Sequence, residues 1–267
     1  MSLYYILLLA IIQGLTEFLP VSSSGHLVLI PYITESNDQG QFIDVAVHIG
    51  TLGAVILYFW QDVKLAFFGF FRLFLGDFSS KGSKLARLLI VATLPVIICG
   101  LILKLSGYNE TIRSVRVIGW AMLLFGVLLY FVDQKSPQGR IKKDWNFIDA
   151  CKIGMWQAIA LIPGSSRSGM TIIGARQLGF NRLDSANISM LMSIPTIIAS
   201  GTLLGSEVFF NADWQSAKIG FIAAVFSFFS GFAALSIMMK MLKTISYSPY
   251  VFYRIILGII ILTISYT

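Results

Sequence analysis

Two short polar stretches interrupt the long apolar runs of this sequence, and they hold the residues that could do chemistry. The first, from Gln13 to His26, reads Gln-Gly-Leu-Thr-Glu-Phe-Leu-Pro-Val-Ser-Ser-Ser-Gly-His, and the second ends in Pro-Gly-Ser-Ser-Arg-Ser-Gly at Gly169. Serine hydroxyls, backbone N–H groups at a helix start and an arginine fork make a donor set that suits phosphate oxygens. Glu17 could hold a divalent cation or transfer a proton, and His26 could act as an acid, a base or a nucleophile at phosphorus.

The composition is that of a protein that crosses a membrane many times. Of the 267 residues, 56% are hydrophobic and only 12% are charged, and the mean hydropathy is +0.79. The net charge of +7 might suit nucleic acid, but the basic residues lie in short loops between apolar runs, where membrane topology explains them better. We therefore expect an all-α integral membrane protein with no nucleic-acid partner.

The apolar runs beside the two polar stretches are too short to cross a membrane. Leu3 to Ile12 would be about 15 Å long as a helix, half of a ~30 Å hydrocarbon core. Because Leu27 to Ile33 is apolar again, we predict a re-entrant hairpin here and a second one around the stretch that ends at Gly169. Val63 to Phe78 is aromatic-rich and is predicted to be an interfacial or tilted helix. Six longer runs are predicted to be transmembrane helices: Phe42 to Trp60, Leu88 to Leu103, Val117 to Val132, Ile188 to Ser206, Ile219 to Met239 and Val251 to Ile264.

The chain also contains an internal repeat. The segments Gln13 to Gly25 and Gln157 to Gly169 have the same length and are offset by 144 residues. Each half would hold one re-entrant hairpin and three crossings, and an odd number of crossings turns the second half upside down. We predict a single membrane domain, 1–267, with an inverted-topology repeat made of residues about 1–133 and about 147–267. This topology puts fifteen Lys and Arg residues inside and four outside, with both termini extracytoplasmic.

Hairpins that enter from opposite faces would bring the two polar stretches together. The predicted cluster joins Glu17, Ser23 and His26 to Arg167. The other residues predicted to bind the ligand are Ser22, Ser24, Gly25, Ser165, Ser166, Ser168, Gly169 and Thr171. Any one serine in a membrane helix more often packs or bonds to the backbone, and Glu17 with Arg167 could be a structural ion pair. The whole set is harder to explain that way, since ionisable residues at membrane depth usually serve function.

Four further polar or reactive residues are expected to have no chemical role, or a weak one. His48 stands alone on an apolar helix and is predicted to be a satisfied core histidine, while Asp44 is a weak candidate near the headgroups. Cys99 and Cys151 show neither metal-ligand spacing nor a plausible disulfide pairing, so we expect them to be inert.

Together the two stretches closely resemble the motifs of the undecaprenyl-diphosphate phosphatases, the bacitracin-resistance membrane family. Both motifs occur in the right order in a chain of matching length and hydropathy. The resemblance implies hydrolysis of a C55 polyprenyl diphosphate to the monophosphate carrier lipid of peptidoglycan synthesis, in the bacterial plasma membrane. It also implies a divalent cation, Mg²⁺ or Ca²⁺, a site that opens to the extracytoplasmic face, contact with membrane lipids, and a homodimer.

Carried over residue by residue, the resemblance makes Glu17 the essential acid, Ser23 and His26 the catalytic serine and histidine, and Arg167 the catalytic arginine, paired with Ser166. Gln13 stands where some members have a second Glu, so it is only a weak metal ligand beside Glu17. Ser23, activated by Glu17 or His26, is the first candidate nucleophile. His26, or a water that it activates, is the second.

A function from another class fits the same architecture. Inverted repeats with broken helices are also typical of secondary transporters and of lipid flippases. A transporter needs a pocket that opens to both sides and coupling to an ion gradient, whereas a phosphatase needs only to release phosphate in detergent.

Overall fold

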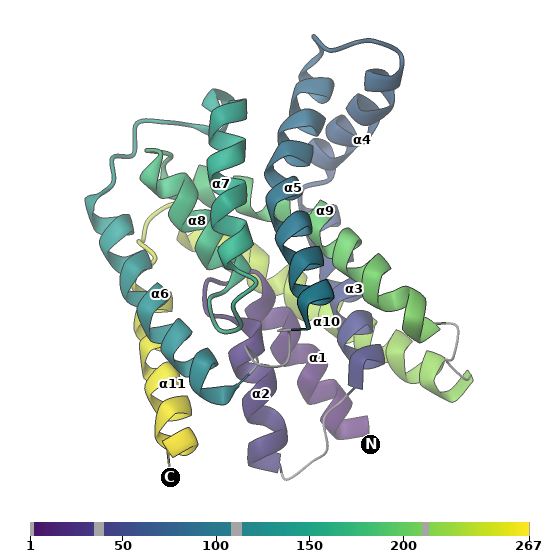
Figure 1. Cartoon of the computed structure of the whole chain (residues 1–267), viewed down its shortest axis with the longest axis vertical. Helices are drawn as coiled ribbons and strands as arrows, with labels where there is room; N and C mark the ends of the chain where they lie inside the picture. The colour runs from purple at the N-terminus through teal and green to yellow at the C-terminus, as the bar shows by residue number, and fades with distance from the viewer. Residues whose placement is uncertain (1–2, 35–39, 108–113, 210–213, 267) are drawn as a thin grey trace.

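The computed structural model describes residues 3–34, 40–107, 114–209 and 214–266, and these residues are almost entirely helical (Figure 1). The α-helices are α1 (Leu3–Glu17), α2 (Ser23–Thr34), α3 (Gly40–Tyr58), α4 (Trp60–Phe74), α5 (Lys81–Ser106), α6 (Val115–Lys135), α7 (Phe147–Ile159), α8 (Arg167–Gln177), α9 (Arg182–Phe209), α10 (Trp214–Met241) and α11 (Ser248–Tyr266). A single turn of 3-10 helix, η2 (Lys142–Asp144), precedes α7. Within the described ranges the only β-type pairing is an isolated bridge between Arg140 and Phe180.

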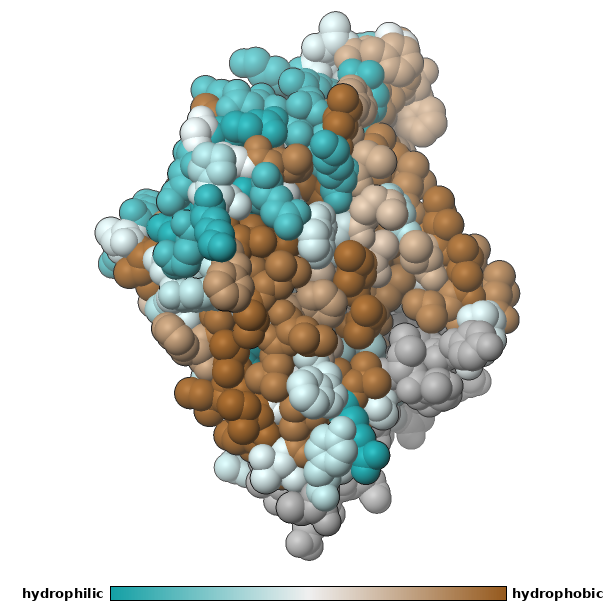
Figure 2. Space-filling view, turned by 60° about the vertical axis from the view of Figure 1, so that its left-hand side comes forward, coloured by the Kyte–Doolittle hydropathy of each residue, from teal (hydrophilic) through white to brown (hydrophobic). Residues whose placement is uncertain are grey.

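Among the residues that the structure describes, five helices are long and apolar enough to cross a membrane. They are α3, α5, α6, residues Ser216–Met241 of α10, and α11, and each coincides with a predicted transmembrane helix. The sixth predicted crossing, Ile188 to Ser206, falls in α9, where some side chains lie outside those the structure describes, and it stays a prediction. Figure 2 shows the consequence on the surface: apolar side chains form a broad band, and hydrophilic side chains gather above it. The chain is an all-α integral membrane protein.

Besides α4, four of the described helices are too short to cross, and they form two pairs, each joined by a turn. Helices α1 and α2 have 15 and 12 residues, and α7 and α8 have 13 and 11. Even the longest reaches only about 22 Å, short of a ~30 Å hydrocarbon core. The turn that joins α1 to α2 and the turn that joins α7 to α8 approach each other in the interior (Figure 1). These turns are the two polar stretches of the sequence.

The packing partners of the two pairs match between the halves of the chain. Helix α1 packs against α10, and α7 packs against α5, which precedes α6 as α10 precedes α11. Helix α3 packs against α9, and α6 against α11. The largest cluster of buried apolar residues includes Phe18 and Val21 from the first turn and Met170 and Ile173 from α8. The apolar core therefore surrounds both polar turns and fixes their separation.

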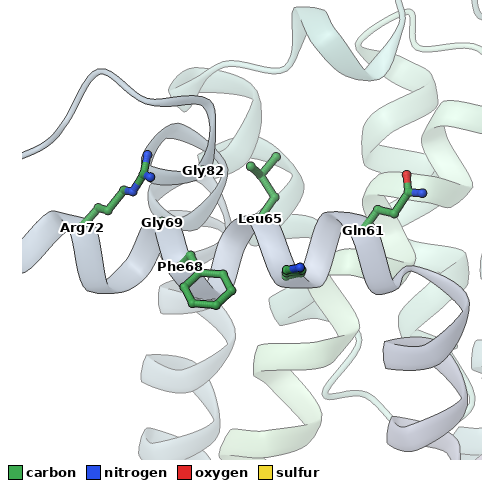
Figure 3. Close-up of a pocket in the computed structure, with 7 residues that line it drawn as sticks. Gln61, Leu65, Phe68, Gly69, Arg72 and Gly82 are labelled. Carbon is green, nitrogen blue, oxygen red and sulfur yellow. The ribbon is translucent and has the colours of Figure 1, made fainter.

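The predicted interfacial helix is seen as α4, which stands with the start of α5 away from the other helices (Figure 1). Gly69 of α4 touches Gly82 of α5 so closely that a Cβ added at Gly69 would lie 2.0 Å from the backbone of Gly82 (Figure 3). The outer face of α4 exposes five phenylalanines: Phe67, Phe68, Phe70, Phe71 and Phe74. Such a face is unsuited to water and suits a membrane surface.

Two of the fifteen basic residues that the predicted topology counts as inside, Arg176 and Arg254, are fully buried. Arg176 donates from Nε to Oδ1 of Asp133 at 3.2 Å, and its other nitrogens bind backbone carbonyls, because a buried guanidinium needs an acceptor for each donor. Arg254 lies inside α11 beside the second polar turn. In the loop before α7, by contrast, Arg140 is half-buried, and the Asp149 carboxylate that it binds raises its pKa.

Candidate active site

The two polar turns share a backbone conformation that is rare for residues with a side chain. Ser22 has φ of 72° and Ser166 has φ of 70°, and among the described residues they are the two non-glycine residues with positive φ. Each also bonds to the serine two positions later: the oxygen atoms are 3.0 Å apart for Ser22 and Ser24, and 3.1 Å apart for Ser166 and Ser168. Strained serines of this kind mark places where the surrounding structure fixes the backbone.

Each turn is bonded to the other turn. The backbone N–H of Gly164 donates to Oγ of Ser24 at 3.1 Å, and Oγ of Ser168 donates to the carbonyl of Leu19 at 3.0 Å. The two polar stretches, far apart in the sequence, therefore meet, as predicted.

A cavity of about 690 Å³ lies where the turns meet, and serines and charged side chains form much of its wall. Its walls come from both turns, α3 and α6. The lining residues are Glu17, Ser22, Ser23, Ser24, Leu27, Val28, Asp44, His48, Ile118, Ala160, Ile162, Pro163, Gly164, Ser166, Arg167 and Ser200. A wall that is about equally polar and apolar suits a ligand with a charged head and an apolar tail.

Glu17 is the hub of the polar contacts in this cavity. Its Oε2 accepts hydrogen bonds from Nε2 of Gln13 at 2.8 Å and from Oγ of Ser23 at 3.1 Å. Its Oε1 accepts a charge-assisted bond from Nη2 of Arg167, and Nη1 of the same arginine donates to the carbonyl of Ser193. Glu17 and Arg167 thus form the ion pair that the sequence analysis gave as a structural alternative. The pair lines a cavity, and the side chain of Arg167 is partly exposed while that of Glu17 is buried.

His48 was predicted to be a satisfied core histidine, and this prediction is wrong. Its side chain lines the cavity and is 36% exposed. Its Nε2 lies 3.2 Å from Nε2 of Gln13 and 3.8 Å from Oε2 of Glu17, while Nδ1 faces the carbonyl of Asp44. Asp44 lines the same cavity one helical turn earlier. The sequence offered one signal for this pair, the spacing of four residues that puts both on one face of a helix.

His26 lies behind the first turn, and both of its ring nitrogens are engaged. Nδ1 is 2.8 Å from the carbonyl of Ser22, and because a carbonyl only accepts, Nδ1 carries the proton. Nε2 is 2.7 Å from the hydroxyl of Tyr253, and the two rings stack with an interplanar angle of 8°. His26 therefore supports the strained backbone of Ser22 and does not line the cavity.

Arg254 supports the second turn in a comparable way. Its Nη2 donates to the carbonyls of Gly164 and Ser165, and its Nε donates to the carbonyl of Met122 at 3.0 Å. Its Nη1 is buried without an acceptor among the described residues and would lie 3.0 Å from a Cβ added at Gly169. The sequence missed this role, because an arginine near a helix end reads as a topology signal.

The remaining predicted ligand-binding residues pack around the cavity rather than line it. Ser165 donates to the carbonyl of Ile162, and Thr171 bonds to the backbone of α8 and to Ser189. Gly25 allows α2 to approach Met122, because an added Cβ would lie 2.6 Å from its sulfur. Ser168 and Gly169 hold the second turn through the bonds described above, since Gly169 N–H donates to Oγ of Ser166 at 3.2 Å. Of the predicted set, Glu17, Ser22, Ser23, Ser24, Ser166 and Arg167 line the cavity.

Comparison with known proteins identifies the family to which this chain belongs. A model of the family described as bacitracin resistance protein BacA matches residues 6–260. The chain belongs to the BacA family.

Full-length relatives of this BacA chain carry one name. "Undecaprenyl-diphosphatase" of Jannaschia sp. is 56% identical over 266 residues, and that of Ruegeria pomeroyi is 55% identical over 267 residues, with 100% of each chain covered in both cases. A more distant relative of the same name, from Saccharophagus degradans, is 42% identical over 260 residues, covering 97% of this chain and 96% of its own.

The resemblance to the BacA family implies a divalent cation as cofactor. The oxygen and nitrogen atoms around the cavity show whether such a cation could bind there. Among the described residues no group of three or more acidic, histidine or cysteine side chains forms a cage by itself. Mg²⁺ is commonly held by only one or two carboxylates together with substrate phosphates. The Glu17 carboxylate lines the cavity, and Oε1 of Gln13 beside it is buried without a donor in the described structure. These two residues fit a cation that is completed by substrate oxygens.

Proposed function

We propose that this chain is an integral membrane phosphatase that hydrolyses undecaprenyl diphosphate to undecaprenyl phosphate and inorganic phosphate. The observation that carries the proposal is the hydrogen bond from the Ser23 hydroxyl to Glu17 inside the cavity, with Arg167 on the same carboxylate. A nucleophile bonded to a base that is itself held by a third group is the arrangement that activates a hydroxyl. The names of the full-length relatives support the same reaction.

In the proposed reaction Oγ of Ser23 attacks the terminal phosphorus while its proton passes to Glu17. The bond from that phosphorus to the bridging oxygen breaks, and the polyprenyl monophosphate leaves. Glu17 gives this proton to the bridging oxygen as the monophosphate departs, and is a carboxylate again. A water then attacks the phosphoserine and gives a proton to Glu17. Glu17 passes that proton to Oγ of Ser23 as the bond from Oγ to phosphorus breaks, which releases inorganic phosphate and restores the Ser23 hydroxyl. Arg167 stabilises charge on the transferred group, as an arginine fork does in phosphoryl transfer. A bound Mg²⁺ or Ca²⁺ would neutralise charge on the diphosphate.

His26 is the second candidate nucleophile, and its contacts favour Ser23 over it. An imidazole that attacks phosphorus needs a nitrogen lone pair directed at the substrate. Nδ1 of His26 is used by Ser22, and Nε2 faces Tyr253. We infer that His26 is a positioning residue, which holds the Ser22 carbonyl and so the serine after it.

The proposal includes an inverted-topology repeat with two re-entrant hairpins. The short helix pairs, the matched serines with positive φ and the matched packing of α1 and α7 support it. Both termini lie at the same end of the molecule, opposite the loop between α6 and α7 (Figure 1). Since that loop carries the basic residues Lys135 to Lys152, we place both termini and the cavity opening on the extracytoplasmic side of the bacterial plasma membrane.

The lipid tail is proposed to leave the cavity past Val28. This residue lines the polar cavity and also a second cavity of about 440 Å³. The second cavity lies between α2, α6 and α11 and is mostly apolar, as the residues Leu29, Val115 and Ile264 show. An apolar path that continues from a phosphate site suits a polyprenyl chain.

Phosphate release from undecaprenyl diphosphate by the purified protein in detergent tests the proposal. Ser23→Ala and Glu17→Gln are each expected to lower kcat by at least about a hundredfold, the usual worth of a nucleophile or base. Ser236→Ala, a serine that bonds only within its own helix, is the matched control and should keep full activity. Full hydrolysis by Ser23→Ala would reject Ser23 as nucleophile. Gradient-coupled lipid movement without phosphate release would favour the transporter or flippase. Mass measurement of the same sample tests the homodimer.

A further inference from the structure

A third cavity, with a basic lining, lies at the start of α5 and shares no lining residue with the cavity around the serines. Its volume is about 410 Å³, and its walls come from α4, α5 and the segment around η2. We call it the lysine cavity; its lining residues are Asp62, Leu65, Lys81, Lys84, Leu85, Leu88, Lys142, Lys143 and Trp145. The reaction proposed above uses none of them.

The charges in this cavity are unbalanced. It holds four lysines and a single carboxylate, Asp62, which binds Nζ of Lys142 with both oxygens at 2.9 Å. The other three, Lys81, Lys84 and Lys143, have no ion pair within the described part of the chain. Three ammonium groups without an acidic partner around one cavity give it a positive potential that attracts an anion.

A buried donor adds to the lysines. Trp145 is 1% exposed, lines the cavity, and its indole N–H has no acceptor among the described residues. An indole N–H buried in a protein usually finds a partner, so an orphaned one beside a cavity indicates a ligand or water oxygen there. The lysines and this N–H are the kind of donors that suit an oxyanion.

The rest of the wall indicates what carries the oxyanion. Leu65, Leu85 and Leu88 make one side of the lysine cavity apolar. Helix α4, which lines the cavity with Asp62 and Leu65, exposes its phenylalanines further along. From Ile90 onward α5 exposes apolar side chains such as Leu94 and Ile98. The cavity thus lies where headgroups meet acyl chains, at the end of the molecule to which the basic loops belong.

We propose that the lysine cavity binds one anionic phospholipid of the cytoplasmic leaflet, with its phosphodiester among the lysines and its acyl chains over the leucines. Basic pockets between membrane helices on the cytoplasmic side are suited to such headgroups. The exposed aromatic face of α4 rests on the same leaflet and keeps the cavity open to it.

Lipid retention by the full-length protein tests this site. Protein purified from nanodiscs of equal parts phosphatidylglycerol and phosphatidylethanolamine is analysed by native mass spectrometry. We expect wild type to retain phosphatidylglycerol preferentially, and Lys81→Gln/Lys84→Gln/Lys143→Gln to lose about tenfold or more of it, since each lysine near an anionic surface is worth about a factor of five. The control triple variant Lys135→Gln/Lys240→Gln/Lys243→Gln removes the same charge elsewhere and should retain wild-type binding.

A variant that is expected to increase lipid retention keeps the test decisive if the triple variant folds poorly. Asp62→Asn removes the carboxylate that neutralises Lys142, so it should retain more phosphatidylglycerol than wild type. Equal loss in both triple variants, equal retention of the two lipids, or no gain in Asp62→Asn would overturn the proposal. Displacement of the lipid by millimolar inorganic phosphate would also overturn it, because the site would then belong to a soluble anion.

Discussion

Ser22 and Ser166 are related by the internal repeat, and both adopt the left-handed backbone conformation, with φ of 72° and 70°. Each precedes the first residue of a short helix, α2 or α8, and each bonds to the serine two residues later. A glycine would take this conformation without strain, yet the chain uses serine at both places. The hydroxyl is therefore worth more to the protein than the relief of strain.

Substitution at these two serines should separate strain from hydrogen bonding. Ser166→Ala loses the hydroxyl and keeps the Cβ strain, whereas Ser166→Gly loses both, so the glycine variant should be the more stable by about 1–2 kcal/mol. The same order is expected at Ser22. Thermal unfolding of the purified variants measures it.

The control for this prediction lies in a regular helix. At Ser236 in α10 glycine should be less stable than alanine, by about 1 kcal/mol. Alanine more stable than glycine at all three positions would show that the positive φ of the turns carries no strain.

The contact between His26 and Tyr253 allows a test of which residue attacks phosphorus. Tyr253→Phe removes the 2.7 Å hydrogen bond and keeps the stacked ring. If His26 only positions Ser22, kcat should fall by no more than about tenfold, the worth of one ordinary hydrogen bond, and KM should change little. If His26 is the nucleophile, freeing Nε2 should raise the rate instead. Steady-state phosphate release distinguishes the two, and Tyr130→Phe on α6, outside the site, is the control.

Substitution of Arg254 should lower both the thermal stability of the protein and its rate of phosphate release. Arg254→Met would leave the carbonyls of Gly164 and Ser165 buried without this donor, at about 1–3 kcal/mol for each, and would also remove the bond to the Met122 carbonyl of α6. We expect the melting temperature to fall by several degrees and activity to fall with it, because the second turn loses its support. Arg254→Lys should recover part of the stability, since one ammonium cannot reach all three carbonyls. Arg72→Met, at an exposed arginine of α4, should leave both quantities unchanged.

The membrane helices and the meeting of the two turns could be predicted from sequence, whereas the supporting residues could not. Hydropathy over 18 or more residues marks α3, α5, α6, α10 and α11, because the hydrocarbon core imposes that length. The repeated Ser-Gly motif marked both turns. His48, Tyr253 and Arg254 were missed because their roles depend on packing between helices far apart in the chain. A histidine on an apolar helix is usually a core residue, and an arginine near a helix end usually marks the membrane topology. Only the three-dimensional neighbours of these two residues show that they have other roles here.

Gln13 offers a test of the proposed cation. Its amide occupies the helical turn before Glu17, and its Oε1 is buried without a donor in the described structure. Gln13→Glu would put a second carboxylate beside Glu17, which should tighten Mg²⁺ or Ca²⁺ binding, because affinity for these ions rises with ligand charge. We expect wild-type phosphate release to stop in excess chelator and to return with added cation, at a lower half-maximal concentration in Gln13→Glu. Gln13→Leu should need more cation than wild type, and Gln134→Glu on α6 should behave as wild type. Activity that survives chelation would remove the cation from the mechanism and leave Arg167 as the cationic partner of the diphosphate.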